Sequence, residues 1–209
     1  MIRTRVKICG LTRAEDIDAA VSAGTDALGF VFYEPSPRSV SVVQAQALVK
    51  SVPAFVCKTG LFVNADVTLV NDAIAHVGLD LLQFHGDESP EYCRQFNRAY
   101  MKAIRMRPDI GLVAEMEKYS DAAAILLDAY HPSKPGGTGE TFDWDRIPAK
   151  RPVPLVLAGG LTPHNIKTAV NTVLPYAVDV SGGVESAKGI KDASLIQQFI
   201  SEVQSANQG

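Results

Sequence analysis

Short apolar runs rich in β-branched residues alternate with longer amphipathic segments along the whole chain. The short runs predict strands, because each has the length and the residue types of one strand. The longer segments carry apolar residues at helical spacing. We expect strands near residues 5–9, 26–32, 55–62, 79–84, 100–105, 123–128, 155–158 and 177–181. We expect helices near residues 14–23, 42–52, 66–76, 90–96, 108–119, 163–172 and 193–205, and a weaker one at 144–147.

This alternation is typical of repeated βα units and therefore of a parallel sheet. Eight strands that are apolar on both faces bury their edges if the sheet closes into a ring, and an open doubly wound sheet is the alternative. A repeat of roughly 25 residues fits a compact barrel. We predict an α/β protein, a (β/α)8 TIM barrel that forms a single compact domain over residues 1–209.

Composition excludes several classes of function. The net charge of -3 leaves no basic excess to neutralise a nucleic acid, and no apolar run approaches the length of a membrane span. The three cysteines are an odd number without CxxC spacing, which disfavours a disulfide framework and a thiolate zinc site. We expect no signal peptide, because the predicted N-terminal strand leaves no room for one. We expect a cytoplasmic protein with a small-molecule ligand.

Paired glycines follow the last two predicted strands. Gly159 and Gly160 end the seventh, while Gly182 and Gly183 follow Ser181 at the end of the eighth. Such pairs let backbone N–H groups approach an anion, and a following helix adds its positive end. A single pair also occurs in plain turns. Because all strands of a parallel barrel end at one face, two pairs at these positions predict a phosphate site.

Cys9 and Asp128 are the candidates for acid–base chemistry. Asp128 ends an apolar run whose side chains favour a protonated carboxyl group, which suits a proton donor; the alternative is a carboxylate that caps the next loop. Cys9 ends the first strand, and Lys7 on the same face would lower the pKa of the thiol. The alternative is a buried cysteine that acts as a small hydrophobe. Residues 12–16 predict a capped helix after this strand.

Three further features belong to the same barrel face. Arg38 lies in a loop stiffened by two prolines, which holds a guanidinium ready to grip a carboxylate; the alternative is a solvated arginine. His85 ends the fourth strand and serves either substrate contact or structure. The Gly/Pro-rich connection over residues 130–142 predicts a lid that closes over Asp128 and excludes water.

Eight short motifs stand in order along nearly the whole chain: VKICGLT at 6–12, GFVF at 29–32, SPRS at 36–39, LQFHG at 82–86, LD at 127–128, GGTG at 136–139, LAGGL at 157–161 and VDVSGGV at 178–184. Together they resemble the phosphoribosylanthranilate isomerase family of tryptophan biosynthesis. Each Gly-Gly motif alone occurs in other phosphate-binding barrels, so the ensemble carries the resemblance.

The resemblance implies an Amadori rearrangement of N-(5'-phosphoribosyl)anthranilate to 1-(2-carboxyphenylamino)-1-deoxyribulose 5-phosphate, without a metal or an organic cofactor. Cys9 takes the place of the family's general base and Asp128 that of its general acid. Arg38 falls where the family holds the anthranilate carboxylate. The remaining substrate-binding positions are His85, Gly159, Gly160, Asp179, Ser181, Gly182 and Gly183. We expect a monomer or a homodimer that binds neither nucleic acid nor membrane.

Two alternatives stay open. One is another phosphosugar barrel enzyme, but a ribulose-phosphate epimerase would need a metal-binding set of histidines and acids, and an indole-glycerol-phosphate synthase would use a lysine as its acid. The other is a barrel that binds a phosphorylated ligand without turnover. Binding alone requires neither Cys9 nor Asp128.

Overall fold

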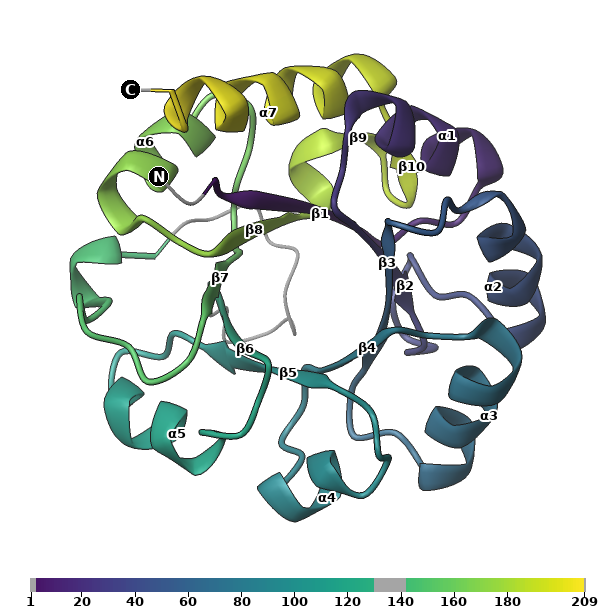
Figure 1. The fold of residues 1–209 in the computed structure, drawn as a ribbon, viewed down its shortest axis with the longest axis horizontal. Helices are drawn as coiled ribbons and strands as arrows, with labels where there is room; N and C mark the ends of the chain where they lie inside the picture. The colour runs from purple at the N-terminus through teal and green to yellow at the C-terminus, as the bar shows by residue number, and fades with distance from the viewer. Residues whose placement is uncertain (1–2, 130–141, 209) are drawn as a thin grey trace.

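A closed barrel of parallel strands in sequence order forms the centre of the molecule, and β1 pairs with β8 to close it. The computed structural model describes residues 3–129 and 142–208. Viewed along the barrel axis, the helices surround the strands (Figure 1). The strands are β1 (Arg5–Cys9), β2 (Ala27–Val31), β3 (Cys57–Phe62), β4 (Leu81–Phe84), β5 (Tyr100–Arg105), β6 (Ala124–Asp128), β7 (Leu155–Leu157) and β8 (Ala177–Val180).

The predicted (β/α)8 fold is confirmed, and its strands agree with the sequence pattern to within two residues at each end. The helices are α1 (Ala14–Ala23), α2 (Val42–Leu48), α3 (Val67–Val77), α4 (Pro90–Arg94), α5 (Leu112–Lys118), α6 (Ile166–Val173) and α7 (Ala193–Ala206). Short 3-10 helices are η1 (Val49–Ser51), η2 (Trp144–Arg146) and η3 (Gly182–Val184). Between β6 and β7, the described residues contain η2 in place of an α-helix, at the weakest of the predicted positions.

The pleat of each strand divides its side chains between two apolar layers. In β6, Ile125 and Leu127 join the outer layer between barrel and helices, whereas Ala124 and Leu126 join the layer inside the barrel. Both faces are therefore buried, which explains the nearly continuous apolar runs in the sequence. Because residues two apart share a face, Asp128 continues the inner row at the end of the strand.

Most helix starts follow local capping chemistry. The carboxylate of Asp192 accepts N–H bonds from Ser194 and Leu195, at 2.8 and 3.0 Å, and so begins α7. The predicted cap of α1 is wrong. The N-cap residue there is Arg13, whose side chain makes no capping bond, while the Thr12 hydroxyl donates to the carbonyl of Gly189 at 2.7 Å. Thr12 therefore ties the β1–α1 loop to the segment that follows β8.

That segment contains a small antiparallel hairpin absent from our sequence prediction, formed by β9 (Glu185–Ala187) and β10 (Ile190–Lys191). Its strands are three and two residues long and mostly exposed, so they carry no apolar alternation that a pattern could reveal. The hairpin lies beyond the end of β8, where it adds charged side chains to the face on which the strands end.

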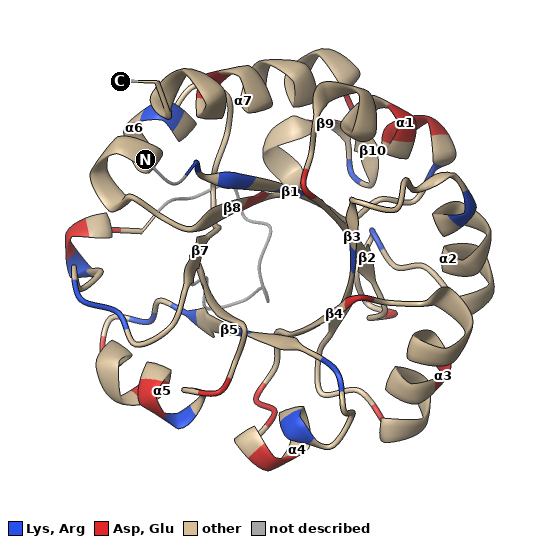
Figure 2. Cartoon of the chain, in the orientation of Figure 1, with Lys and Arg blue, Asp and Glu red and all other residues tan. Residues whose placement is uncertain are grey.

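Charged residues of both signs are distributed over the outer helices (Figure 2). Within residues 3–129 and 142–208, no helix is long and apolar enough to cross a membrane. All three cysteines are free thiols.

Candidate active site

One cavity of about 680 Å³ lies at the face where the barrel strands end. All ten residues selected from the sequence line it: Cys9, Arg38, His85, Asp128, Gly159, Gly160, Asp179, Ser181, Gly182 and Gly183. They come from six different strand ends or the loops that follow them. The barrel therefore gathers residues that are up to 174 positions apart in sequence (183 minus 9).

Cys9 ends β1 and is 4% exposed, next to Gly29 of β2 in the strand register. A Cβ atom built on Gly29 would lie 2.7 Å from the Cys9 Sγ and 3.0 Å from the Lys7 Nζ. Both distances are shorter than ordinary van der Waals contacts. The glycine at position 29 thus leaves the space that the thiol and the ammonium group occupy together.

The Cys9 thiol is a weaker acid than the sequence predicts. Burial raises its pKa above the ordinary value, and the nearby Lys7 opposes this shift without offsetting it. The expectation of a lowered pKa was therefore wrong, because it counted the lysine and not the loss of solvent. Burial also disfavours the Lys7 ammonium, but Asp179 and Cys9 outweigh burial and raise the pKa of Lys7. The Lys7 Nζ lies 2.9 Å from the Asp179 Oδ1 in a buried ion pair.

Asp128 is the last residue of β6, on the inner face of the barrel, and is 6% exposed. Its Oδ2 is 3.1 Å from the Nε2 of His85, and the Nδ1 of the same ring is 3.0 Å from the amide Nε2 of Gln83. Gln83 is fully buried in β4. The carboxyl group of Asp128 is thus held by a chain of two side chains that reaches into the barrel.

The loop that carries His85 is fixed by a buried ion pair. The Lys102 Nζ lies 3.0 Å from the Glu88 carboxylate and also donates to the carbonyl of Gly86 at 2.6 Å. Glu88 in turn accepts the N–H groups of Gly86 and Asn64. Removing one partner of such a pair typically costs about 3–5 kcal/mol, because the other charge stays buried. His85 therefore sits on a rigid support.

Arg38 is already engaged by a side chain of the β9 strand. Its Nε and Nη2 each lie 2.7 Å from an oxygen of Glu185, and the Lys191 Nζ lies 2.8 Å from the same carboxylate. Burial opposes the ionisation of Glu185, but the bonds from Arg38 and Lys191 outweigh it and hold the pKa of Glu185 below its ordinary value. Lys191 also donates to the carbonyl of Ser181 at 3.2 Å. A positive cluster therefore adjoins the second glycine loop.

The two glycine loops touch each other. Gly159 and Gly160 have φ angles of 80° and 63°, which favour glycine. A Cβ atom on Gly183 would lie only 1.9 Å from the carbonyl oxygen of Leu161. The sequence predicts a helix directly after the first loop, near residue 163. In the structure α6 begins only at Ile166. The backbone of the first loop and the η3 turn nevertheless form one wall of the cavity.

We expect the Gly183→Ala variant to bind inorganic phosphate at least about 10-fold more weakly than the unchanged chain, because the new methyl group forces the two loops apart. Overpacking of this kind also costs about 1–3 kcal/mol of stability. Calorimetric titration and a melting curve measure the two effects. Gly111→Ala is the matched control, since a Cβ there meets no atom within 4 Å. Equal phosphate affinity in both variants would contradict a phosphate site at this wall.

Several cavity residues were not selected from the sequence. Gln83, Glu185 and Lys188 line the cavity, and Lys191 stands behind it. Gln83 belongs to the LQFHG motif at residues 82–86. Its position two residues before His85 is the sequence signal that could have indicated it. The pairing of Arg38 with Glu185 spans 147 residues, and no local pattern indicates it. The predicted lid over residues 130–142 lies, except for its last residue, outside the described residues.

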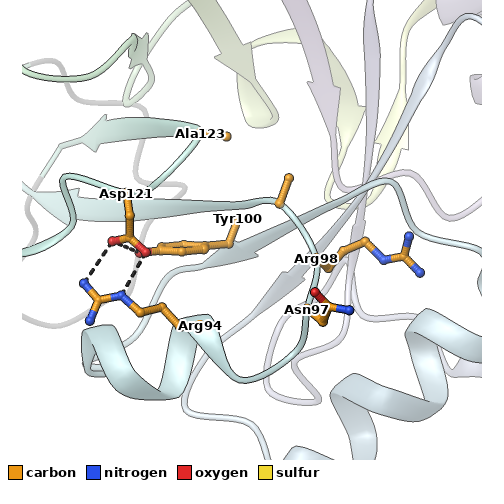
Figure 3. A pocket seen from close by; sticks show the side chains of 7 residues that line it. Arg94, Asn97, Arg98, Tyr100, Asp121 and Ala123 are labelled. Carbon is orange, nitrogen blue, oxygen red and sulfur yellow. Dashed lines mark hydrogen bonds and ion pairs between the residues drawn. The ribbon is translucent and has the colours of Figure 1, made fainter.

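A second hollow, of about 400 Å³, lies at the opposite end of the barrel, where β5 begins and the chain enters β6 (Figure 3). Here the Arg94 guanidinium binds Asp121 through two bonds of 2.8 and 3.0 Å, and the Tyr100 hydroxyl donates to the same carboxylate at 2.8 Å. The bond from Arg94 lowers the pKa of Asp121 to about 2. Arg94, Tyr100 and Asp121 thus satisfy one another's charged and polar groups.

Comparisons with known proteins identify the family of the chain. A family model described as N-(5'phosphoribosyl)anthranilate (PRA) isomerase matches residues 6–202. The N-(5'-phosphoribosyl)anthranilate isomerase of Cellvibrio japonicus is 58% identical over 195 residues, which cover 93% of this chain and 91% of the relative.

Solved structures give the same result. The phosphoribosyl anthranilate isomerase of Thermotoga maritima superposes with a TM-score of 0.89 at 38% identity, covering 97% of this chain and 99% of that one. Another phosphoribosyl anthranilate isomerase, solved with reduced 1-(o-carboxyphenylamino)-1-deoxyribulose 5-phosphate, has a TM-score of 0.83 at 36% identity with the same coverage. The chain belongs to the N-(5'-phosphoribosyl)anthranilate isomerase family.

Proposed function

We propose that this chain catalyses the Amadori rearrangement of N-(5'-phosphoribosyl)anthranilate to 1-(2-carboxyphenylamino)-1-deoxyribulose 5-phosphate in tryptophan biosynthesis. The observation that carries the proposal is the shared cavity, in which a thiol, a carboxyl group, an arginine and two glycine loops meet. The substrate offers a matching set of groups: an acidic proton, a ring oxygen, a carboxylate and a phosphate.

In the first step, Asp128 donates a proton to the furanose ring oxygen. The bond between this oxygen and C1' breaks, and the lone pair of the anthranilate nitrogen forms the iminium ion. A carboxyl group in a buried site suits this role, because few water molecules compete for its proton. The Nε2 of His85, 3.1 Å from the Asp128 Oδ2, binds the carboxylate that remains.

In the second step, the Cys9 thiolate removes the proton from C2'. The electrons of the broken C–H bond neutralise the iminium nitrogen and leave an enolamine, which tautomerises to the ketone. Lys7 favours the thiolate, although burial keeps the pKa of the thiol above its ordinary value. The substrate's own nitrogen serves as the electron sink, so these steps use only acid–base groups of the chain.

Binding uses Arg38 and the two glycine loops, all of which line the cavity. Glu185 takes two of the five N–H donors of Arg38, which orients the guanidinium and leaves donors for the anthranilate carboxylate. The loops with Gly159, Gly160, Ser181, Gly182 and Gly183 supply backbone N–H groups for the phosphate. Asp179, held by Lys7, and His85 complete the substrate-binding set.

We expect the Arg38→Ala variant to raise KM about 10- to 100-fold, with a smaller effect on kcat, because a lost charged hydrogen-bond pair costs about 1.5–3 kcal/mol. Steady-state kinetics with freshly made substrate measure both constants. Arg94→Ala, in the hollow at the opposite end of the barrel, is the control and should leave both constants unchanged. An unaltered kcat/KM for Arg38→Ala would contradict the carboxylate clamp.

The test of the function itself is a fluorescence assay, in which the fluorescence of the anthranilate group decreases as purified protein consumes the substrate. Chromatography of the product identifies the aminoketose. A well-folded protein that binds the substrate and leaves it unchanged would instead indicate a phosphoryl-ligand-binding barrel.

We also propose a cytoplasmic monomer or homodimer. Three free cysteines suit a reducing compartment. A related isomerase from Thermotoga maritima is described as dimeric and has also been obtained as monomers.

A further inference from the structure

We propose that Gln83 is a positioning residue, whose amide fixes the proton of His85 on Nε2 and directs it at Asp128. This inference rests on the proposed function, because it concerns the acid of that reaction. Gln83 itself reaches no substrate group in the proposed steps and acts through the imidazole ring of His85.

The first support is the geometry of the chain of side chains. Gln83 and His85 are two residues apart and thus on the same face at the end of β4, while Asp128 belongs to β6. The contacts of 3.0 Å at Nδ1 and 3.1 Å at Nε2 occupy both ring nitrogens of His85. A neutral imidazole has one donor and one acceptor nitrogen, so the partner of Nδ1 decides what Nε2 can do.

The second support is the environment of the Gln83 amide. Its side chain is 0% exposed, and within the described part of the chain its Oε1 has no hydrogen-bond partner. Turning the amide around would place its NH2 group, with two donors, in the position where the oxygen now lies. In the present orientation, Oε1 and one of the two N–H groups lack a partner among the described residues, whereas in the turned orientation both N–H groups would lack one. A buried N–H group without a partner is rarer than a buried carbonyl oxygen without one. The amide nitrogen therefore faces the ring, and Nδ1 must accept.

The consequence for Asp128 follows directly. With Nδ1 as acceptor, the proton of the neutral ring lies on Nε2 and donates to the Asp128 Oδ2. This bond is strongest when the carboxyl group has lost its proton, because hydrogen bonds to ionised acceptors are roughly twice as strong as neutral ones. Gln83 thus stabilises the state that Asp128 reaches after it has protonated the ring oxygen.

Two substitutions separate this role from simple packing. Gln83→Glu keeps the shape and replaces the donor by an acceptor, which moves a proton to Nδ1. Gln83→Met keeps the approximate volume and removes the hydrogen bond. We expect kcat to fall about 10-fold in Gln83→Met and about 100-fold in Gln83→Glu, with KM changed less than about threefold. Thr59→Val, an equally buried change in β3, is the control and should leave kcat unchanged.

A double-mutant cycle with His85→Gln tests whether Gln83 acts through the ring. We expect Gln83→Met to lower kcat no further in the His85→Gln background, because the ring that it positions is gone. A purely structural role would give the same fold-change in both backgrounds, and that result would overturn the proposal.

The closing experiment does not depend on activity. Protein with 15N-labelled imidazole rings is studied by NMR, and the signals of His85 are assigned by their loss in His85→Gln, against those of the other three histidines. We expect a protonated Nε2 and an unprotonated Nδ1 in the unchanged chain, and a protonated Nδ1 in Gln83→Glu. A proton on Nδ1 of the unchanged, neutral ring would overturn the inference, even if the chain proves to be an active isomerase. An inactive chain with the expected spectrum would count against the proposed function alone.

Discussion

We expect the Cys9→Ala variant to lose about 10³-fold or more in kcat while it keeps its fold and its affinity for the product. The thiolate is the only base in the proposed second step, and alanine cannot accept the C2' proton. The fluorescence assay measures turnover, and circular dichroism checks the fold. Cys57→Ala is the matched control, because the Cys57 side chain lies outside the cavity lining. A Cys9→Ala variant with near-normal kcat would remove the thiol from the mechanism.

The pH dependence gives a second readout of the same residue. Because burial raises the pKa of the Cys9 thiol, only a small share of it is ionised near neutral pH. The thiolate fraction grows as the pH rises. We therefore expect kcat to increase from neutral pH into the alkaline range, beyond the point at which an exposed thiol would be fully ionised. The remaining activity of Cys9→Ala should lack this rise.

The Asp128→Asn variant should be nearly as damaged, with a loss of about 10²- to 10³-fold in kcat, because the amide keeps the shape of the acid and has no proton to donate to a ring oxygen. Its oxygen can still accept the bond from His85. Single-turnover kinetics locate the loss in ring opening, where substrate binds normally and no iminium forms. Asp87→Asn, in the same loop as His85 but exposed, is the control. Unchanged turnover in Asp128→Asn would reduce the residue to a structural role.

The strand ends were predictable because they depend on local signals. Cys9 and Asp128 each end an apolar run, and a parallel barrel converts strand ends into neighbours. The same reasoning located both glycine loops. Local patterns also predicted a helix over residues 193–205, which agrees with α7. The position of a residue along a strand or helix can therefore be predicted from the sequence.

Pairings between distant side chains were not predictable. Glu185 binds Arg38 through a two-stranded hairpin whose residues show no apolar alternation. The Thr12 side chain bonds the carbonyl of Gly189 instead of capping α1. The error over the acidity of Cys9 has a related cause, because the degree of burial depends on residues from several strands. A charge two residues away is visible in a sequence, whereas the loss of solvent is not.

The pairing of β1 with β8 means that the active site forms only when both halves of the chain are joined in one barrel. The pairing of Lys7 with Asp179 lies between these two strands, two residues before the thiol. A fragment that ends before β5 would contain Cys9, Arg38 and His85 but neither Asp128 nor the glycine loops. Each half of the chain thus holds only some of the catalytic and binding residues. Catalysis requires that β1 of one half pairs with β8 of the other. Recovery of turnover from separately produced halves would therefore report barrel closure rather than the folding of either fragment.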